Sequence, residues 1–172
     1  MTAPKSVGRQ PGEPFDPEGV AWTRVSPRLA RARRVSLGIW LGLLALAAVV
    51  PLLALGLLVP TAVVGMVFAA LGCWGQWVIG RQVRAWGYAE RQDDLLVRRG
   101  ILMRKLVVVP YGRMQYVDVD AGPLDRMFRI ATVQLHTAAA ATDARIPGLP
   151  PEEAARLRDR LASRGEAQLA GL

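Results

Sequence analysis

The hydrophobic and polar positions divide the chain into three stretches. Residues 1–34 are polar and rich in proline and glycine, and they show no apolar period. The 46 residues from 35 to 80 contain no Asp, Glu, Lys, Arg or His. From residue 81 onward, short segments of alternating polarity are separated by turn residues. A soluble domain of this size almost never contains so long an uncharged run, so the pattern predicts a membrane-embedded segment.

The uncharged run fits two membrane crossings joined by a tight turn. One crossing takes roughly 20 apolar residues. The segment Gly56-Leu57-Leu58-Val59-Pro60 supplies a turn signal, because proline suits the first turn of a helix, where its missing N–H costs nothing. We therefore predict helices over 37–57 and 61–80 within a hairpin at 35–80. Pro51 is expected to kink the first helix.

Basic residues flank this predicted hairpin on both sides, and its turn carries no charge. Because positive residues stay on the cytoplasmic side, both termini are expected in the cytoplasm. Residues 1–34 are interpreted as a disordered, basic juxtamembrane arm in a chain of net charge +8. Each flanking charge could contribute about 1 kcal/mol to contact with anionic lipid, or could serve only to set topology. These candidates are Arg28, Arg31, Arg33 and Arg34 before the hairpin, and Arg81 and Arg84 after it.

The residues after the hairpin predict a small β domain over 81–165. Alternating segments bounded by turn residues indicate short strands. We expect strands at 84–91, 95–99, 101–109, 113–120, 131–138 and 143–146, with a break at 147–150. Several antiparallel strands followed by one helix indicate a small barrel or sandwich that the helix caps.

The capping helix is expected over 151–164. Pro151 suits its first turn, and Ala154, Leu157 and Leu161 form a narrow apolar stripe. A row of arginines at 156, 160 and 164 is interpreted as a solvated face, with a docking surface for lipid or protein as the alternative. Gly165 is expected to end the helix before a tail at 166–172. The predicted fold class is α+β: a two-helix transmembrane hairpin followed by a small β domain with a C-terminal helix.

Candidate chemistry is sparse. Cys73 and His136 are the single residues of their kinds, so an intramolecular disulfide is excluded and a zinc site is not supported. We interpret Cys73 as a packing residue and place His136 on the outer face of a strand. The sequence contains no HExxH, CxxC or P-loop motif. It therefore predicts no enzymatic activity, no cofactor, no metal, no small-molecule substrate and no nucleic-acid partner.

Five stretches together carry a resemblance to a known family. They are Trp86 and Tyr88 ahead of 95–100, the segment 110–117, the segment 122–130, the strand 131–137, and Ile146-Pro147-Gly148-Leu149 followed by a helix. In these stretches the chain resembles the bacterial PH-like family of membrane proteins, the YdbS-like group. The resemblance implies two transmembrane helices followed by one bacterial pleckstrin-homology domain, with no enzymatic activity and no established ligand. Arg129 departs from the pattern, which often has glycine after the aromatic residue.

Within these stretches we interpret the matching residues as structural, with a ligand site as the alternative. Pro110 closes a strand, and Gly122-Pro123 sets a turn. Arg113 and Arg126 could form an ion pair with Asp125. The complete set of motif residues is Pro110, Arg113, Gly122, Pro123, Arg126, Pro147 and Gly148.

Two functions are compatible with these features. The leading hypothesis is an interaction module at the cytoplasmic face of the bacterial plasma membrane, which binds a protein partner or its own copies. The resemblance implies a larger membrane protein with repeated PH-like domains as a partner, and a link to envelope stress. The alternative is a sensor of anionic membrane lipids, which would add Arg98, Arg99, Arg104 and Lys105 to the juxtamembrane arginines. Phosphoinositide recognition at the first strand pair is not expected, because the turn Gln92-Asp93-Asp94 is acidic and would repel phosphate.

Overall fold

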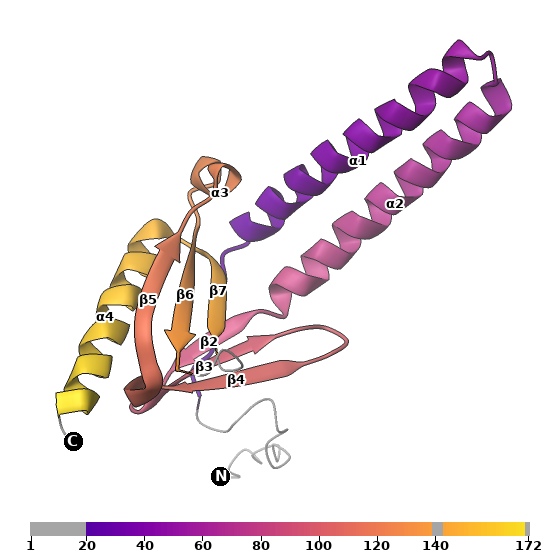
Figure 1. The fold of residues 1–172 in the computed structure, drawn as a ribbon. Coiled ribbons are helices and arrows are strands. Elements are labelled where there is room, and N and C mark those ends of the chain that lie inside the picture. The colour runs from indigo at the N-terminus through magenta and orange to yellow at the C-terminus, as the bar shows by residue number, and fades with distance from the viewer. Residues whose placement is uncertain (1–19, 139–142, 171–172) are drawn as a thin grey trace, which may run out of the picture.

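In the computed structural model, which describes residues 20–138 and 143–170, two long helices extend from a folded domain (Figure 1). The domain contains two small antiparallel sheets and a C-terminal helix, which confirms the predicted fold class. In chain order the elements are β1 (Thr23–Arg24), α1 (Arg28–Ala54), α2 (Leu58–Arg84), β2 (Gly87–Glu90), β3 (Asp94–Arg99), β4 (Lys105–Pro110), the 3-10 turn η1 (Tyr111–Arg113), β5 (Met114–Asp120), α3 (Pro123–Met127), β6 (Ala131–Thr137), β7 (Ala144–Leu149) and α4 (Pro151–Ala170).

The helices α1 and α2 form the predicted apolar hairpin. Both are long and apolar enough to cross a membrane. Each has 27 residues, which corresponds to a length of about 40 Å at 1.5 Å per residue. Gly56 lies in the turn between them with a positive φ of 71°, and Pro60 lies in the first turn of α2. Along the hairpin, α2 passes α1 closely where Gly75 faces Leu37.

The sequence immediately before the hairpin belongs to the folded domain. β1 pairs antiparallel with β2, with Thr23 opposite Tyr88. Val25, Leu29 and Ala32 are all buried in the core of the domain. The prediction of a disordered arm is therefore wrong for residues 20–34, and residues 1–19 lie outside the described residues. A two-residue strand has no periodicity of its own, so only its pairing with β2 reveals it.

The two sheets have the strand orders β1-β2-β3-β4 and β5-β6-β7. Alternation along β6 is as predicted, with Val133 and Leu135 fully buried and His136 on the outer side. The predicted strand 101–109 is shorter than expected, because residues 100–104 form the turn before β4. Gly100 takes a positive φ of 100° in this turn. A Cβ at Gly100 would collide with the carbonyl of Met103.

β7 continues through Pro147 and Gly148, where the sequence predicted a break. Leu149 pairs with Ala131 and Ile146 pairs with Val133, so β7 carries an extra residue at this point and forms a bulge. Proline is tolerated within a sheet at a bulge. Gly148 has a φ of 74°, and its carbonyl accepts a hydrogen bond from the Ser26 N–H at 3.0 Å. The bulge therefore attaches the sheet to the start of α1.

The short helix α3 begins at the Gly122-Pro123 turn. Pro123 is its first residue, and the Gly122 N–H donates to the Asp125 carboxylate at 3.3 Å. The ion pair predicted for Asp125 with Arg113 or Arg126 does not form within the described part of the chain. The cap on α3 uses the Asp125 carboxylate instead.

Arg129 follows α3 in the left-handed conformation, with a φ of 52°. This conformation costs an L-amino acid roughly 1–2 kcal/mol relative to its preferred regions, whereas glycine adopts it freely. The departure from the family pattern at Arg129 therefore falls at a backbone position that favours glycine.

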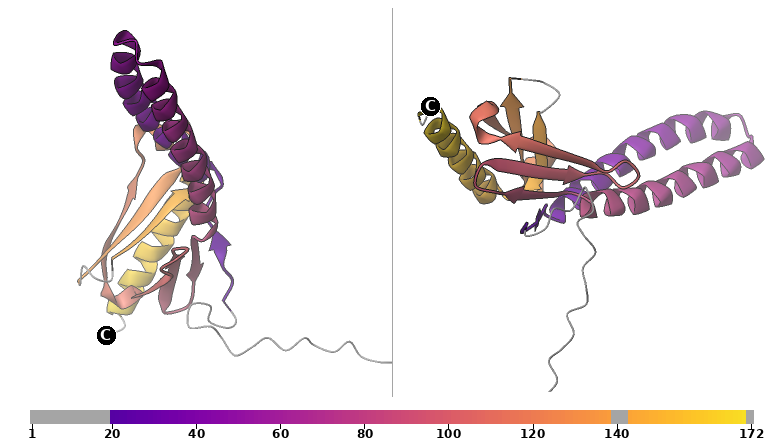
Figure 2. Two further views of the ribbon diagram at one scale, coloured as in Figure 1. Left: turned by 90° about the vertical axis from the view of Figure 1, so that its right-hand side faces the viewer. Right: turned by 90° about the horizontal axis from the view of Figure 1, so that it is seen from below.

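The helix α4 covers the sheets on the side away from the hairpin (Figures 1 and 2). Its predicted apolar stripe is confirmed, because Ala154, Leu157 and Leu161 are fully buried. Gly165 does not end the helix; it is buried, and a Cβ there would lie 3.7 Å from the carbonyl of Tyr111. The predicted tail is therefore helical over 166–170, and residues 171–172 lie outside the described residues.

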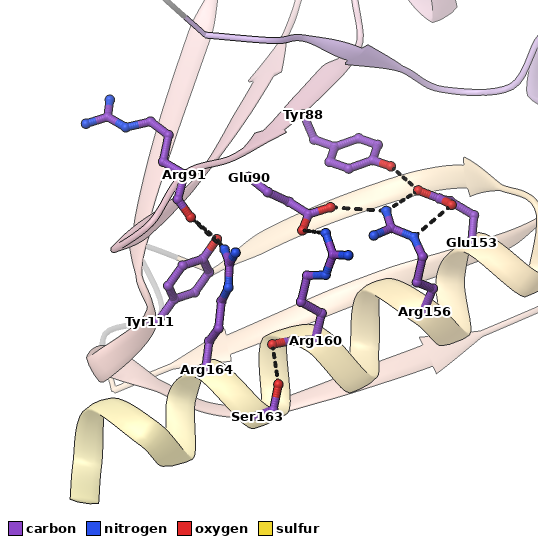
Figure 3. A network of polar contacts seen from close by, with 9 residues as sticks. All are labelled: Tyr88, Glu90, Arg91, Tyr111, Glu153, Arg156, Arg160, Ser163 and Arg164. Atoms are coloured by element: carbon purple, nitrogen blue, oxygen red, sulfur yellow. Dashed lines mark hydrogen bonds and ion pairs between the residues drawn. The ribbon is translucent and has the colours of Figure 1, made fainter. Parts of the chain in front are cut away.

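The arginine row of α4 is largely exposed, as predicted for a solvated face, and it also binds the end of β2. Arg156 and Arg160 both bind the Glu90 carboxylate, at 3.1 and 2.9 Å (Figure 3). Arg156 also donates to Glu153 from Nε at 3.1 Å. The remaining contacts of this network are Tyr88 OH to Glu153 (2.8 Å), Tyr111 OH to the Arg91 carbonyl (3.1 Å), Arg164 to the Arg91 carbonyl (2.6 Å) and Arg164 to Tyr111 OH (2.9 Å).

Glu153 makes the attachment of α4 dependent on pH. The hydrogen bond from Arg156 lowers the pKa of Glu153, against the opposing effect of burial. Because the folded-state pKa lies below the ordinary value of about 4.3, the stabilisation is complete above that pH and is lost as the pH falls through the folded-state pKa. We expect Glu153→Gln to reduce the unfolding free energy by about 1 kcal/mol at neutral pH, the size typical of a partly exposed charged hydrogen bond.

Urea unfolding of the full chain in detergent measures this difference. It should be present near neutral pH and diminish as the pH falls below the ordinary glutamate value of about 4.3, because wild-type Glu153 becomes protonated as the pH passes its lowered folded-state pKa. Glu166→Gln is the control, because Glu166 is an exposed carboxylate on the same helix and forms no ion pair with any described residue. An undiminished effect of Glu153→Gln in acid would contradict the role given to its charge.

Candidate functional site

Because consecutive strands run in opposite directions, every second connection between them lies at the end of the domain next to the hairpin. β2 leads away from α2, so the β2–β3 turn lies at the far end and the β3–β4 turn (residues 100–104) lies back at the hairpin. The same alternation places α3 and the end of β7 at the hairpin end. Figure 1 shows α3 beside the start of α1, and the β3–β4 turn below the base of α2. These elements form the candidate site.

The β3–β4 turn presents two apolar side chains to solvent. Leu102 is 94 % exposed and Met103 is 88 % exposed, the highest values among the exposed large apolar residues of the described chain. Exposed apolar side chains gathered in one place commonly mark an interaction surface. Arg104 and Lys105 follow directly and are exposed. An apolar tip flanked by cations is suited to the boundary between lipid headgroups and hydrocarbon.

A cavity of about 690 Å³ lies between the start of α1 and the folded domain. Its walls come from α1, β3, α3, β6 and β7. Three arginines line it, namely Arg33 from α1, Arg99 from β3 and Arg145 from β7. Asp125 of α3 is the acidic residue in the same wall. The cavity is therefore an open, positively charged site at the junction between hairpin and domain.

The charges around this cavity are incompletely balanced. Arg33 donates to the Gln82 side chain at 3.2 Å, and it is repelled by the charge of Arg145 and attracted by that of Asp125. Arg99 and Arg145 form no ion pair with the residues that the structure describes. An anionic group of a ligand could offset the excess positive charge.

The other predicted lipid-contact residues lie on separate surfaces around the hairpin base. Arg81 lies over the ring of Trp77 at 4.8 Å, and Arg98 lies over the ring of Trp22 at 4.5 Å. The structure therefore brings only Arg33 and Arg99 of the predicted set into the cavity. The exposed arginines elsewhere on the hairpin base are Arg28, Arg31, Arg34, Arg81 and Arg84.

Several motif residues that we interpreted as structural also border the cavity. Gly122, Pro123 and Pro147 line it, and Gly148 lies against Leu29, another residue of its wall. Pro110 ends β4 and Arg113 ends η1, away from the cavity. Arg126 is exposed on α3.

Sequence reasoning missed Arg145, Leu102 and Met103. Arg145 has no distinguishing neighbours in the sequence, and only the pairing of β7 with β6 and its packing on α1 bring it near Arg33. Leu102 and Met103 did carry a signal, as two apolar residues between Gly100 and a basic pair. The prediction placed them inside a strand and so lost that signal.

His136 lies outside this site. Its ring stacks on Tyr116, with centroids 4.4 Å apart, and its nitrogens lie 3.7 Å from Asp118 and 3.5 Å from Asp143. Among the described residues no group of three or more His, Cys, Asp or Glu side chains is arranged to hold a metal ion.

Comparison with known proteins identifies relatives of this chain. The model of the family "Bacterial PH domain" matches residues 36–165, which include most of both hairpin helices and the domain through most of α4. The transmembrane protein YdbS of Bacillus subtilis (strain 168) is 39 % identical over 79 residues, an alignment that covers 46 % of this chain and 48 % of that protein. The alignment thus spans about half the length of this relative. No solved structure matches the chain.

Proposed function

Because this chain belongs to the bacterial PH domain family and is a membrane protein, we propose that it is a membrane-anchored PH module whose folded domain binds the bilayer that its own hairpin spans. The hairpin holds the domain at the cytoplasmic face of the bacterial plasma membrane, with both termini on that side. The role is non-enzymatic. The observation that carries the proposal is the apolar tip, Leu102 and Met103, with its basic flank at the hairpin end of the domain.

The length of the uncharged segment supports contact between this tip and lipid. Hydrocarbon about 30 Å thick takes roughly 20 helical residues per crossing, so the membrane boundary falls near Arg34 and Arg81, where the uncharged run ends. The β3–β4 turn lies at that end of the domain (Figure 1). Burial of one Leu or Met side chain contributes about 1.5–3 kcal/mol, and each nearby cation about 1 kcal/mol on an anionic surface. Because the hairpin already tethers the domain, even weak contacts would keep it on the bilayer.

A fluorescent label at residue 102 tests this proposal. Cys73 is the single cysteine, so Leu102→Cys in a Cys73→Ser background accepts one environment-sensitive dye. We expect blue-shifted emission in nanodiscs that contain phosphatidylglycerol, and quenching by lipids that carry a spin label. Both the blue shift and the quenching should be smaller in nanodiscs of phosphatidylcholine alone.

The same dye at Ala162→Cys provides the control, since Ala162 is exposed on α4, on the side away from the hairpin (Figure 2). This label should report water in both kinds of nanodisc. If the label at residue 102 also reports water in phosphatidylglycerol nanodiscs, the domain does not lie on the bilayer.

A second candidate function is self-association or binding of a membrane-protein partner. It is favoured by β5, an edge strand of its sheet on which Tyr116 is 54 % exposed and Val119 is 37 % exposed. Edge strands offer unpaired backbone groups to other chains. Sizing and mass spectrometry after mild-detergent purification from native membranes test this function. A stoichiometric complex that is lost with Val119→Lys would support it, and a monomer that carries only lipid would contradict it.

A further inference from the structure

We propose that the cavity between the hairpin and the domain binds the phosphodiester headgroup of one anionic phospholipid, with Arg33, Arg99 and Arg145 as the phosphate ligands. This inference rests on the proposed function, because it requires the domain to lie at a lipid surface. It goes further in assigning a single headgroup to a defined site, distinct from the contact made by the apolar tip.

The convergence of three arginines is the first support for this site. They come from α1, β3 and β7, three elements that are far apart in the chain, and they line one cavity. Bringing like charges together costs free energy unless an anion offsets it. Asp125 offsets only one of these charges, and its carboxylate already accepts the Gly122 N–H. Arginine suits a phosphate ligand because its planar guanidinium can donate two hydrogen bonds to phosphate oxygens.

The position of the cavity along the hairpin is the second support. Arg33 and Ser36 line the cavity, and the uncharged run begins between them at residue 35. The cavity therefore lies at the level where hydrocarbon ends and lipid phosphates begin. A site for a free phosphate ion would not need to lie at the level of the membrane surface. A lipid whose phosphate enters the cavity could instead extend its acyl chains along the apolar hairpin.

The size and lining of the cavity are the third support. Its volume of about 690 Å³ falls within the range of roughly 300–1,000 Å³ that is usual for small-molecule sites. Leu29, Trp86 and Leu124 contribute apolar side chains to the lining of the same cavity. A lining of this kind suits the glycerol carbons that adjoin a lipid phosphate.

Native mass spectrometry of the full chain in detergent tests the assignment. The probes are phosphatidylglycerol and phosphatidylcholine, each added at equal concentration. We expect the protein to retain one phosphatidylglycerol in preference to phosphatidylcholine. Arg145→Gln and Arg99→Gln should each lower the affinity for phosphatidylglycerol by about tenfold, the factor expected for a lost charged hydrogen bond of 1.4 kcal/mol.

Arg158→Gln is the matched control, because it removes the same charge from an exposed residue of α4 that pairs with Asp159. Its affinity should equal that of the wild-type protein. Circular dichroism spectra of all variants verify that they remain folded. Equal retention of the two lipids, or unchanged affinity in both Arg145→Gln and Arg99→Gln, would overturn the proposal.

Two further experiments distinguish a lipid headgroup from free phosphate, and the lipid site in the cavity from the proposed contact of the apolar tip with the bilayer. Inorganic phosphate at millimolar concentration should displace little lipid; if it binds the wild-type protein and releases phosphatidylglycerol fully, the site takes free phosphate and the lipid assignment is wrong. Substitution of Leu102 and Met103 by serine should leave the retained lipid unchanged in detergent. If the cavity does not bind a lipid headgroup, the protein will show no preference for phosphatidylglycerol. If the proposed function is wrong, the label at residue 102 will remain in water.

Discussion

Replacing Gly148 with alanine is expected to destabilise the folded domain by about 3 kcal/mol, from the sum of backbone strain and a steric clash. Gly148 has a φ of 74°, a conformation that L side chains rarely adopt. A Cβ at this position would lie 2.6 Å from the Cβ of Leu29, which is itself buried at the start of α1. The substitution therefore both strains the bulge of β7 and pushes the sheet away from α1.

Urea unfolding of the full chain in detergent, followed by near-ultraviolet circular dichroism, measures this loss. Gly122→Ala is the control, because Gly122 has an ordinary φ of −67° and a Cβ there would make a normal contact of 3.5 Å. Leu29→Gly removes the clashing Cβ but not the backbone strain at residue 148, so it should recover part of the stability lost in Gly148→Ala when the two are combined. Strict additivity of the two changes would mean that the bulge does not press on α1.

Truncation of Leu157 to alanine should cost the domain about 3 kcal/mol, within the range for deletion of a buried leucine. Leu157 is fully buried where α4 packs on η1, β5 and β6. Its removal leaves a cavity between the helix and the sheets, and the exposed polar contacts of α4 cannot compensate for it. The same unfolding measurement determines the loss.

The neighbouring residue gives a matched comparison for this prediction. Arg158 is exposed, and Arg158→Ala should change the unfolding free energy by no more than about 0.5 kcal/mol. Equal effects of the two substitutions would show that α4 does not close the core in the way that its burial indicates.

The hairpin and the order of the later elements could be predicted because their signals are local. An uncharged run of 46 residues fits little other than membrane helices, and the turn at Gly56 follows from residues next to it. The stripe of Ala154, Leu157 and Leu161 is likewise contained within one helix. In these segments, periodicity and turn chemistry agree with the tertiary structure.

The errors occur where a distant partner decides the local structure. β1 exists only through its pairing with β2 across the whole hairpin, and α4 continues past Gly165 because that residue packs on η1. Because of its bulge, β7 contains Pro147 and Gly148, two residue types that usually end strands. The arginines of α4 are largely exposed, as their spacing predicts, but only the fold shows that Glu90 lies opposite Arg156 and Arg160 and binds both.

The candidate site was predictable only in part for the same reason. Arg33 and Arg99 could be selected as basic residues near the hairpin and at a strand end. Arg145 could not, because its role depends on β7 reaching α1. The acidic turn Gln92-Asp93-Asp94 was predicted to disfavour phosphate, and the alternation of strand direction additionally places it at the end of the domain far from the hairpin.

The pairing of β1 with β2 also determines when the domain can be completed during synthesis. β1 and the first turns of α1 are made before the hairpin, whereas the strand that receives β1 is made after it. The ribosome must therefore deliver both apolar helices before the first sheet can close. A fragment that starts at residue 81 would lack β1, Val25 and Leu29, and would expose the edge of β2 and part of the core. The domain thus contains segments from both sides of the hairpin, and the pairing of β1 with β2 holds the two ends of the hairpin together.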